Sequence, residues 1–183
     1  MDHILIPLAE GLEEIEAVTP IDVLRRAGLK VVTCSLGKNI EVEGSHGIIL
    51  KADCRINDLE KEKLTGVVLP GGMPGSKNLK ENQQLLELIR NLAEKDGLLA
   101  AICAAPIVLE EAGVLTERQA TSYPGFAQEM SSCIYREEKI VRDGNIFTGR
   151  GPGVALDFSY TLVEYLLDEK TVINLKKQMM VEK

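Results

Sequence analysis

Short apolar runs alternate with helix-like segments along this chain, and that alternation most constrains how the chain folds. His3–Leu8 is apolar, Glu13–Ala27 mixes apolar and charged residues, and Lys30–Leu36 is apolar again. Gly28 ends the helical segment, and Pro20 lies inside it as a candidate bend. A strand–helix–strand unit of this length is typical of parallel sheets with right-handed crossovers.

Later segments continue the alternation. The predicted strands are Gly66–Leu69, Leu98–Ile102 and a hairpin of Lys139–Arg142 with Ile146–Thr148. The predicted helices are Leu79–Lys95, Pro106–Ala112, Val154–Leu167 and Thr171–Val181. The segment Lys38–Lys51 alternates weakly and favours a hairpin at a sheet edge. Since no repeat or linker interrupts the pattern, we expect a single doubly wound α/β domain over residues 1–183, with a mostly parallel central sheet.

The bulk composition argues against several classes of partner. The net charge is −7, and no basic run provides a surface for nucleic acid. Aromatic residues make up 4% of the chain, without tryptophan, so platforms for stacking bases are not expected either. No apolar run approaches the roughly 20 residues of a membrane span, and the first residues lack the basic and apolar regions of a signal peptide. We therefore expect a cytoplasmic protein that binds neither nucleic acid nor membrane.

The four cysteines do not have the spacing of a metal site. Cys34, Cys54, Cys103 and Cys133 form neither CxxC nor CxxH, so no metal is predicted. A cytoplasmic chain of this size also needs no disulfide framework. Cys34 lies in an apolar run and is expected in the core, whereas Cys54 and Cys133 have more polar surroundings. Only Cys103 has a setting that suggests chemistry.

The segment Gly97–Pro106, GLLAAICAAP, places Cys103 between a buried strand and a helix. The alanines around it leave little bulk beside the sulfur. A thiol at this turn is close to the positive end of the helix dipole, which favours the reactive thiolate. The arrangement is the cysteine counterpart of a nucleophile elbow. The alternative is a small buried hydrophobic residue, since free cysteine is often buried.

A parallel sheet gathers the loops that leave its carboxyl ends on one rim, and several polar residues of this chain fall in such loops. Glu16, about one helical turn after the first loop, is a candidate acid or base for the thiol, with a solvated carboxylate as the alternative. The backbone N–H groups of Gly71 and Gly72 are candidate oxyanion donors, or the glycines serve a tight turn. Arg150 is a candidate for holding a carboxylate or an oxidised sulfur, or forms a surface ion pair.

The two histidines do not supply the usual partner of a nucleophilic cysteine. His3 opens the first strand and is expected to be structural, while His46 lies in the edge segment. Neither forms an H-x-E pair, so a glutamine-amidotransferase triad is not indicated. The glycines after residue 70 match neither GxGxxG nor a P-loop, so phosphate binding has little support.

Four motifs in order resemble the ThiJ/PfpI superfamily, specifically its DJ-1-like (Parkinson-disease protein) branch. They are EGLEEIEAVTPIDVLRRAG, VVLPGGMPGSKNL, GLLAAICAAP and DGNIFTGRGPG. The resemblance implies a flavodoxin-like three-layer sandwich with Cys103 on an elbow and Glu16 hydrogen-bonded to its sulfur. It implies Gly72 and Ala104 as backbone oxyanion donors, and no metal or organic cofactor. It also implies a homodimer, with Glu13–Ala27 and Lys38–Lys51 at a two-fold interface.

The sequence departs from this family at Tyr123, which stands where many relatives have a histidine. A phenol is a poor base near neutral pH, so Tyr123 argues against a Cys–His protease mechanism. Two functions remain open. In the first, Cys103 and Glu16 convert methylglyoxal or glyoxal to a hydroxy acid, as in the glyoxalase and deglycase relatives. In the second, the protein is a redox-responsive stress protein or chaperone, in which Cys103 is oxidised without turnover.

Overall fold

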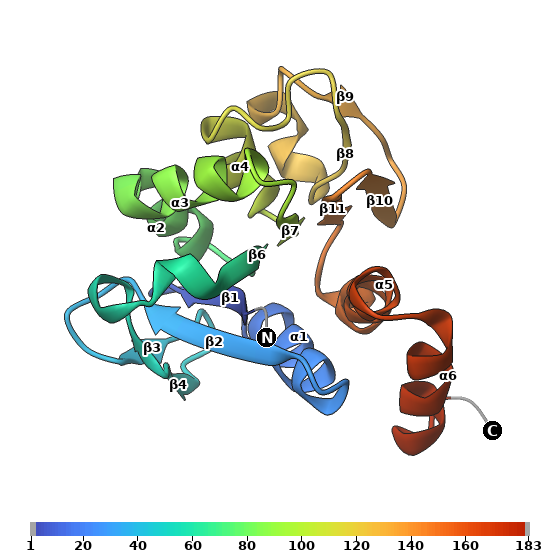
Figure 1. The fold of residues 1–183 in the computed structure, drawn as a ribbon. Coiled ribbons are helices and arrows are strands. Elements are labelled where there is room, and N and C mark those ends of the chain that lie inside the picture. The colour runs from blue at the N-terminus through green and yellow to red at the C-terminus, as the bar shows by residue number, and fades with distance from the viewer. Residues whose placement is uncertain (1–2, 182–183) are drawn as a thin grey trace.

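The computed structural model describes residues 3–181 and is built around a seven-stranded sheet with the order β10-β11-β7-β6-β1-β2-β5 (Figure 1). All neighbouring strands are parallel except β10 and β11, which form the predicted antiparallel hairpin. The strands of this sheet are β1 (His3–Leu8), β2 (Lys30–Ser35), β5 (Cys54–Arg55), β6 (Leu64–Leu69), β7 (Leu98–Ile102), β10 (Ile140–Asp143) and β11 (Ile146–Gly149). The predicted mostly parallel, doubly wound α/β fold is confirmed.

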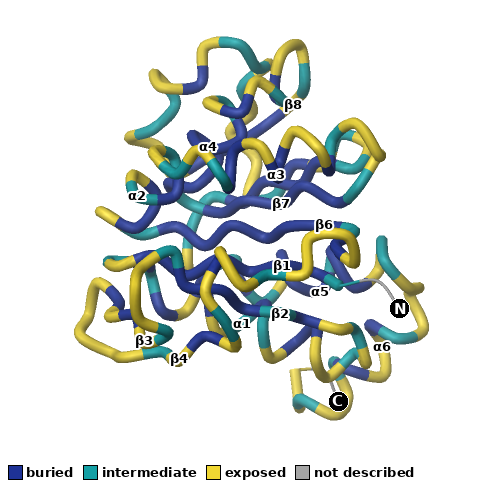
Figure 2. Tube along the Cα trace, turned by 60° about the vertical axis from the view of Figure 1, so that its left-hand side comes forward, coloured by how far each residue is buried: buried dark blue, intermediate teal, exposed yellow. Residues whose placement is uncertain are grey.

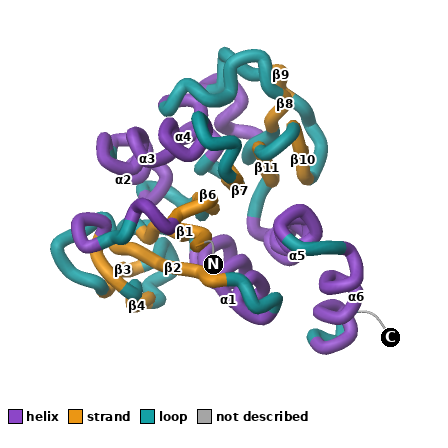
Figure 3. Tube along the Cα trace, viewed as in Figure 1, coloured by secondary structure: helices purple, strands orange, loops and turns teal. Residues whose placement is uncertain are grey.

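Helices cover both faces of the sheet and complete three layers (Figures 1 and 3). One face packs against α2, α3 and α4, and the other packs against α1, α5 and α6. The α-helices are α1 (Glu14–Arg26), α2 (Gly75–Glu81), α3 (Gln83–Ala93), α4 (Pro106–Glu111), α5 (Ala155–Leu166) and α6 (Glu169–Gln178). Short 3-10 turns occupy Ile56–Asp58, Lys61–Lys63, Pro124–Glu129 and Pro152–Val154.

The core consists of two buried apolar clusters, one on each side of the sheet. The central strands β1, β6 and β7 are buried along almost their whole length, as their continuous apolar sequences require (Figure 2). Leu5, Leu69 and Leu99 point to one cluster, whereas Ile4 and Val68 point to the other. This burial on both faces fixes the register of the strands that carry the site.

One predicted helix is in fact two. The sequence pattern predicts a continuous helix over Leu79–Lys95, but α2 ends at Glu81 and α3 begins at Gln83. The residue between them, Asn82, has extended backbone angles, and its side-chain oxygen accepts a hydrogen bond from the N–H of Leu85 at 2.9 Å. Asparagine is a preferred N-cap because this bond satisfies a free backbone donor, so it separates the helices.

The segment Lys38–Lys51 forms the predicted hairpin, but not as part of the central sheet. Its strands, β3 (Glu41–Glu43) and β4 (Ile49–Lys51), pair only with each other as a separate two-stranded sheet. The edge of the central sheet is instead β5, which the sequence pattern does not predict because it has only two residues. The sequence pattern also does not predict a second short pair of strands, β8 (Gln119–Ala120) and β9 (Ile134–Tyr135).

The fold brings four loops to one rim, because β1, β6, β7 and β11 are parallel neighbours. Their last residues are Leu8, Leu69, Ile102 and Gly149. The loops that follow contain the glutamates before α1, Gly71 and Gly72, Cys103, and Arg150. In the described part of the chain, no helix has the length and apolar character needed to cross a membrane.

Candidate active site

Cys103 lies directly after β7, at a sharp turn before α4. Its φ angle is +62°, a left-handed conformation that costs a residue with a side chain on the order of 1–2 kcal/mol. Two backbone hydrogen bonds hold it there: its N–H donates to the carbonyl of Gly149, and its carbonyl accepts from the N–H of Tyr123, both at 2.8 Å. The predicted elbow is therefore present, and the end of β11 and the segment after β8 hold it in place.

Glu16 lies in the first turn of α1 and is fully buried, with 0% exposure. Its Oε2 accepts a hydrogen bond from the N–H of Gly71 at 3.0 Å. Glu13 caps the same helix, since its Oε2 accepts from the N–H of Glu16 at 2.8 Å. The solvated alternative for Glu16 is therefore wrong, because the loop after β6 covers this carboxyl.

Burial raises the pKa of the Glu16 carboxyl from 4.5 to about 7. Interaction with the Cys103 thiol and the Gly71 N–H lowers this pKa, and the Glu13 charge raises it, but burial is the largest influence. The second oxygen, Oε1, is also buried and accepts no hydrogen bond from the described residues. A carboxyl with this pKa can gain and lose a proton near neutral pH, as a general acid or base must.

Burial disfavours the charged form of the Cys103 thiol. Burial, and then the charge of Glu16, raise its pKa to about 12, while the N–H groups of Ala104 and Gly72 act in the opposite direction. This direction is opposite to that of the thiolate that the sequence predicts at a helix N-terminus, and α4 begins only at Pro106. The thiol can give its proton to the neighbouring Glu16 carboxylate during attack on a substrate.

Gly71 and Gly72 have different roles in the loop after β6. Gly71 donates its N–H to Glu16, so it is not free as an oxyanion donor. A Cβ on Gly71 would lie 2.7 Å from the Cβ of Cys103, which shows why the loop needs glycine there. Gly72 has a φ of +91°, and its N–H acts on the Cys103 sulfur together with that of Ala104. Two backbone donors thus meet at the sulfur.

Tyr123 and Arg150 lie at the border of the site. Within residues 3–181, neither side chain forms a hydrogen bond with the Cys103 thiol. The Tyr123 side chain is 50% exposed, and its backbone N–H is the group that holds Cys103. The Arg150 guanidinium donates to the backbone carbonyl of Glu137 at 3.0 Å. This hydrogen bond ties Arg150, in the loop that follows β11, to the segment before β10, and the candidate role of Arg150 in holding a carboxylate or an oxidised sulfur stays a prediction.

An ion pair of Glu14 with His46 lies beside the site and has no counterpart among the sequence-based expectations. Glu14 is buried and accepts hydrogen bonds from the N–H and Nδ1 of His46, both at 2.7 Å. Burial opposes the Glu14 charge, but these bonds and one from Ile48 outweigh it and lower the Glu14 pKa to about 2. The pair ties the β3–β4 loop to α1. No sequence signal reveals it, because 32 residues separate its members.

Glu14 and His46 also belong to a cluster of side chains of the types that bind metal ions. In residues 3–181, the ligand atoms of Glu13, Glu14 and His46 all lie within 4.8 Å of one another. Glu13 already caps α1 and Glu14 already binds His46, so these oxygens serve the fold. The arrangement is explained by those hydrogen bonds without a metal ion.

The fold and the rim define a class: flavodoxin-like α/β proteins with a cysteine on a strand-to-helix elbow, beside a buried carboxyl from the first helix. Residues 2–165 match the DJ-1/PfpI family. The chain belongs to this family, as the motifs of the sequence indicate.

Several relatives of known name match along nearly the whole chain. The protein dj-1beta of Drosophila melanogaster is 37% identical over 179 residues, which are 97% of this chain and 96% of the relative. The glutathione-independent glyoxalase DJR-1.2 of Caenorhabditis elegans is 32% identical, over 98% of this chain and 96% of the relative. DJ-1 homologues B and A of Arabidopsis thaliana are both 36% identical, but the chain spans only 41% and 46% of their lengths.

Solved structures agree with this assignment. The crystal structure of Drosophila melanogaster DJ-1beta has a TM-score of 0.95 and 36% identity, over 100% of this chain and 99% of that chain. The structure of oxidized Toxoplasma gondii DJ-1 has a TM-score of 0.94 and 34% identity, over 98% of each chain. The flavodoxin-like sandwich that the resemblance implies is therefore confirmed.

Proposed function

We propose that this protein converts small reactive dicarbonyl compounds, such as methylglyoxal or glyoxal, to hydroxy acids without a cofactor. The observation that carries the proposal is the buried Glu16 carboxyl, with a pKa of about 7, next to the elbow thiol of Cys103. A base whose pKa is near the working pH transfers protons most effectively. The pair thus supplies a nucleophile and a proton carrier in one buried place.

The first step forms a covalent adduct. The Cys103 sulfur attacks the aldehyde carbon of methylglyoxal while Glu16 takes the thiol proton, which gives a hemithioacetal. The N–H groups of Gly72 and Ala104 favour negative charge at the sulfur and support the oxygen that becomes charged during attack. Attack through the neutral thiol suits a site in which the Cys103 pKa is raised to about 12.

The later steps move protons within the adduct. Glu16 first gives the thiol proton to the alkoxide oxygen of the adduct and becomes a carboxylate again. It then takes the proton of the former aldehyde carbon and returns it to the neighbouring carbon, while the hydroxyl proton passes from the first oxygen to the second, so the first carbon is oxidised and the second is reduced. The product is a lactoyl thioester on Cys103. Water then hydrolyses the thioester to lactate and restores the thiol. The balance is one methylglyoxal and one water for each lactate, so no external oxidant or reductant is needed.

Two further observations support this choice. A relative that is 32% identical over nearly its whole length is named a glutathione-independent glyoxalase. The Tyr123 side chain, which stands where many relatives have histidine, is half exposed and does not hydrogen-bond to the thiol, so Glu16 is the titratable group placed to move protons. We propose the cytoplasm as the location of this activity.

The test is lactate formation from methylglyoxal with no added thiol or metal, by wild type and by Glu16→Gln. Glutamine retains an acceptor for the Gly71 N–H but cannot carry the proton. We expect the variant to lose turnover by about 10²–10⁴-fold, the usual contribution of a general base. Turnover by Glu16→Gln at the wild-type rate would exclude Glu16 as the proton carrier.

A redox-responsive role is the second candidate. The N–H groups of Gly72 and Ala104 would also stabilise an oxidised, negatively charged sulfur, and the Toxoplasma gondii relative is described as oxidized. In this role, peroxide adds oxygen to Cys103 selectively and wild type forms no lactate. Mass spectrometry after limiting peroxide, together with the lactate assay, separates the two functions.

The proposed homodimer would use α1 and the β3–β4 hairpin. Four apolar side chains there are exposed: Ile15, Val18, Ile48 and Ile49. Val18, Ile21 and Leu50 line one surface hollow of about 310 Å³, so the helix and the hairpin share a surface. An apolar patch of this kind supports self-association, and a two-fold dimer is the commonest closed arrangement.

Light scattering tests the dimer. We expect a mass twice the 20.0 kDa of one chain. Val18→Glu should shift the mass to that of a monomer. In a two-fold dimer, the substitution would place one carboxylate from each copy in the apolar interface, where the two charges repel each other. Ile173→Glu, at an exposed apolar position on α6, is the matched control and should remain dimeric. A monomeric wild type at micromolar concentration would overturn the proposal.

A further inference from the structure

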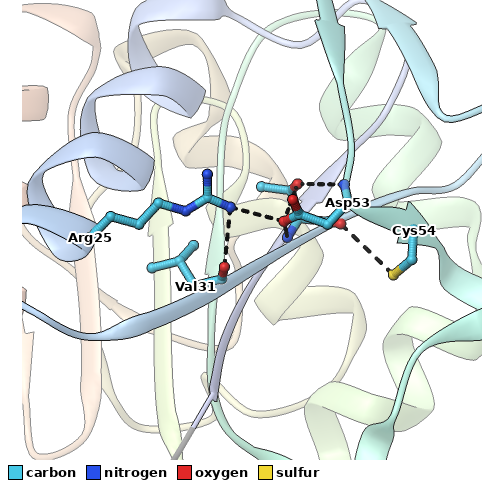
Figure 4. Close-up of polar contacts among 5 residues, drawn as sticks. Arg25, Val31, Asp53 and Cys54 are labelled. Atoms are coloured by element: carbon cyan, nitrogen blue, oxygen red, sulfur yellow. Dashed lines mark hydrogen bonds and ion pairs between the residues drawn. The ribbon is translucent and has the colours of Figure 1, made fainter.

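The edge strand β5 is fastened to β2 by a network of hydrogen bonds around Asp53. The Asp53 carboxylate accepts from the N–H and the hydroxyl of Thr33, both at 2.8 Å, and from the Arg25 guanidinium at 2.9 Å. The N–H of Asp53 donates to the Thr33 hydroxyl at 2.9 Å. Figure 4 shows Arg25 and Asp53 joined in this way, with Cys54 immediately beyond. The residue before Cys54 is therefore pinned to the residue before Cys34.

This network holds two thiols opposite each other. Cys34 and Cys54 are direct partners in the parallel register of β2 and β5. Neighbouring strands lie about 4.8 Å apart, which falls within the roughly 4.4–6.8 Å between Cα atoms that a disulfide requires. Partners in register point to the same face, and both side chains pack in the same apolar cluster. The Cys54 thiol is directed at β2, since it donates to the Thr33 carbonyl at 3.8 Å.

The two thiols differ in their access to solvent. Cys34 is fully buried, whereas Cys54 is partly exposed and lines a surface hollow of about 270 Å³. A small oxidant can therefore reach Cys54 and not Cys34. Since β5 is a two-residue strand at the edge of the sheet, β2 is the one strand of that sheet, within residues 3–181, with which it pairs.

We propose that Cys34 and Cys54 form an oxidation site, in which a hydroperoxide converts the two thiols to a disulfide between β2 and β5. The Cys54 sulfur attacks the peroxide oxygen and becomes a sulfenic acid, with release of an alcohol, or of water from hydrogen peroxide. The Cys34 sulfur then displaces the hydroxyl group from Cys54 as water, and the S–S bond forms. Two thiols are oxidised and one peroxide is reduced, so atoms and electrons balance.

The disulfide would close the segment that contains the β3–β4 hairpin. This hairpin lies between residues 34 and 54, and its loop is tied to Glu14 at the start of α1 through His46. Oxidation would thus restrain the edge of the sheet and the support of the candidate active site together. Burial raises the pKa of both thiols, and the charges of Asp53 and Asp58 add to the effect at Cys54. The reaction should therefore be slow at neutral pH and faster in alkali.

The test uses the full chain with Cys103→Ser, so that oxidation of Cys103 does not compete. The folded protein is treated with dilute hydrogen peroxide, free thiols are blocked with iodoacetamide, and trypsin is added without reductant. Cleavage places Cys34 and Cys54 in separate peptides with one cysteine each, Val31–Lys38 and Ala52–Arg55. We expect these peptides joined by a disulfide, two hydrogen atoms lighter than their sum, and at least about tenfold more abundant than any disulfide with Cys133.

Cys103→Ser combined with Cys54→Ser is the matched control. It should give no disulfide with Cys34, and should lose the rise in melting temperature that oxidation gives when both thiols are present. Three results would overturn the proposal: a sulfinic acid on Cys54 with Cys34 still free, a disulfide between two chains, or a Cys34–Cys54 disulfide that forms only in unfolded protein.

Discussion

Replacing Glu16 with glutamine should change how the stability of the protein depends on pH. The folded protein raises the Glu16 pKa from 4.5 to about 7, chiefly by burial. The folded state therefore binds this proton more tightly than the unfolded state does. The resulting stabilisation is fully present below about pH 4.5 and is lost as the pH rises through 7.

The size of this effect follows from the two pKa values. At about 1.4 kcal/mol for each pH unit, the difference between 4.5 and about 7 corresponds to a loss on the order of 3 kcal/mol. Glutamine stays neutral, keeps the shape of the side chain and offers an acceptor to Gly71. As the pH rises from acid to mildly alkaline, the free energy of unfolding of Glu16→Gln should therefore increase by about this much relative to that of wild type.

Urea unfolding of wild type and Glu16→Gln, at about pH 5 and about pH 8, measures the effect. Other titrating groups are common to both proteins and cancel in the comparison. Glu87→Gln, on the exposed side of α3, is the matched control and should show the same pH dependence as wild type. If Glu16→Gln also followed wild type at both pH values, the carboxyl would not be buried as described, and the reasoning would be refuted.

Three further results are expected. Tyr123→His should change lactate formation by less than about tenfold, because Glu16 carries the proton; a site that needs an imidazole would gain about 10²–10⁴-fold. His46→Ala should lower the melting temperature by a few degrees, most clearly between pH 5 and 6 where the raised His46 pKa keeps both partners charged; an unchanged melting curve would show that Glu14 needs no partner. Gly71→Ala should abolish lactate formation, since its Cβ would lie 2.7 Å from that of Cys103; full activity would contradict this crowding.

The elements with strong local signals could be predicted from the sequence. The apolar runs of β1 and β7 are buried on both sides, and a glycine with positive φ follows each of α1 and α4. These features depend on neighbouring residues and appear in the sequence itself. The elbow at Cys103 was predictable for the same reason, because a strand, small residues and a helix adjoin it.

Features that depend on distant residues were not predictable. The burial of Glu16 arises from the loop after β6, which donates the Gly71 N–H across 55 residues of chain. The raised Cys103 pKa arises from this same burial and from Glu16, neither of which can be read from the residues next to Cys103. Glu13, Glu14 and Glu16 look alike in the sequence, yet they become a helix cap, an ion-pair partner and a buried acid.

The most direct test of the proposed function is the formation of lactate from methylglyoxal by wild type, Cys103→Ser and Cys133→Ser, without added glutathione or metal. Cys133 is a partly buried cysteine away from the elbow and serves as the control. We expect lactate from wild type and Cys133→Ser, and only the uncatalysed background from Cys103→Ser. Lactate formation that survives Cys103→Ser, or a wild type that forms none, would contradict the account.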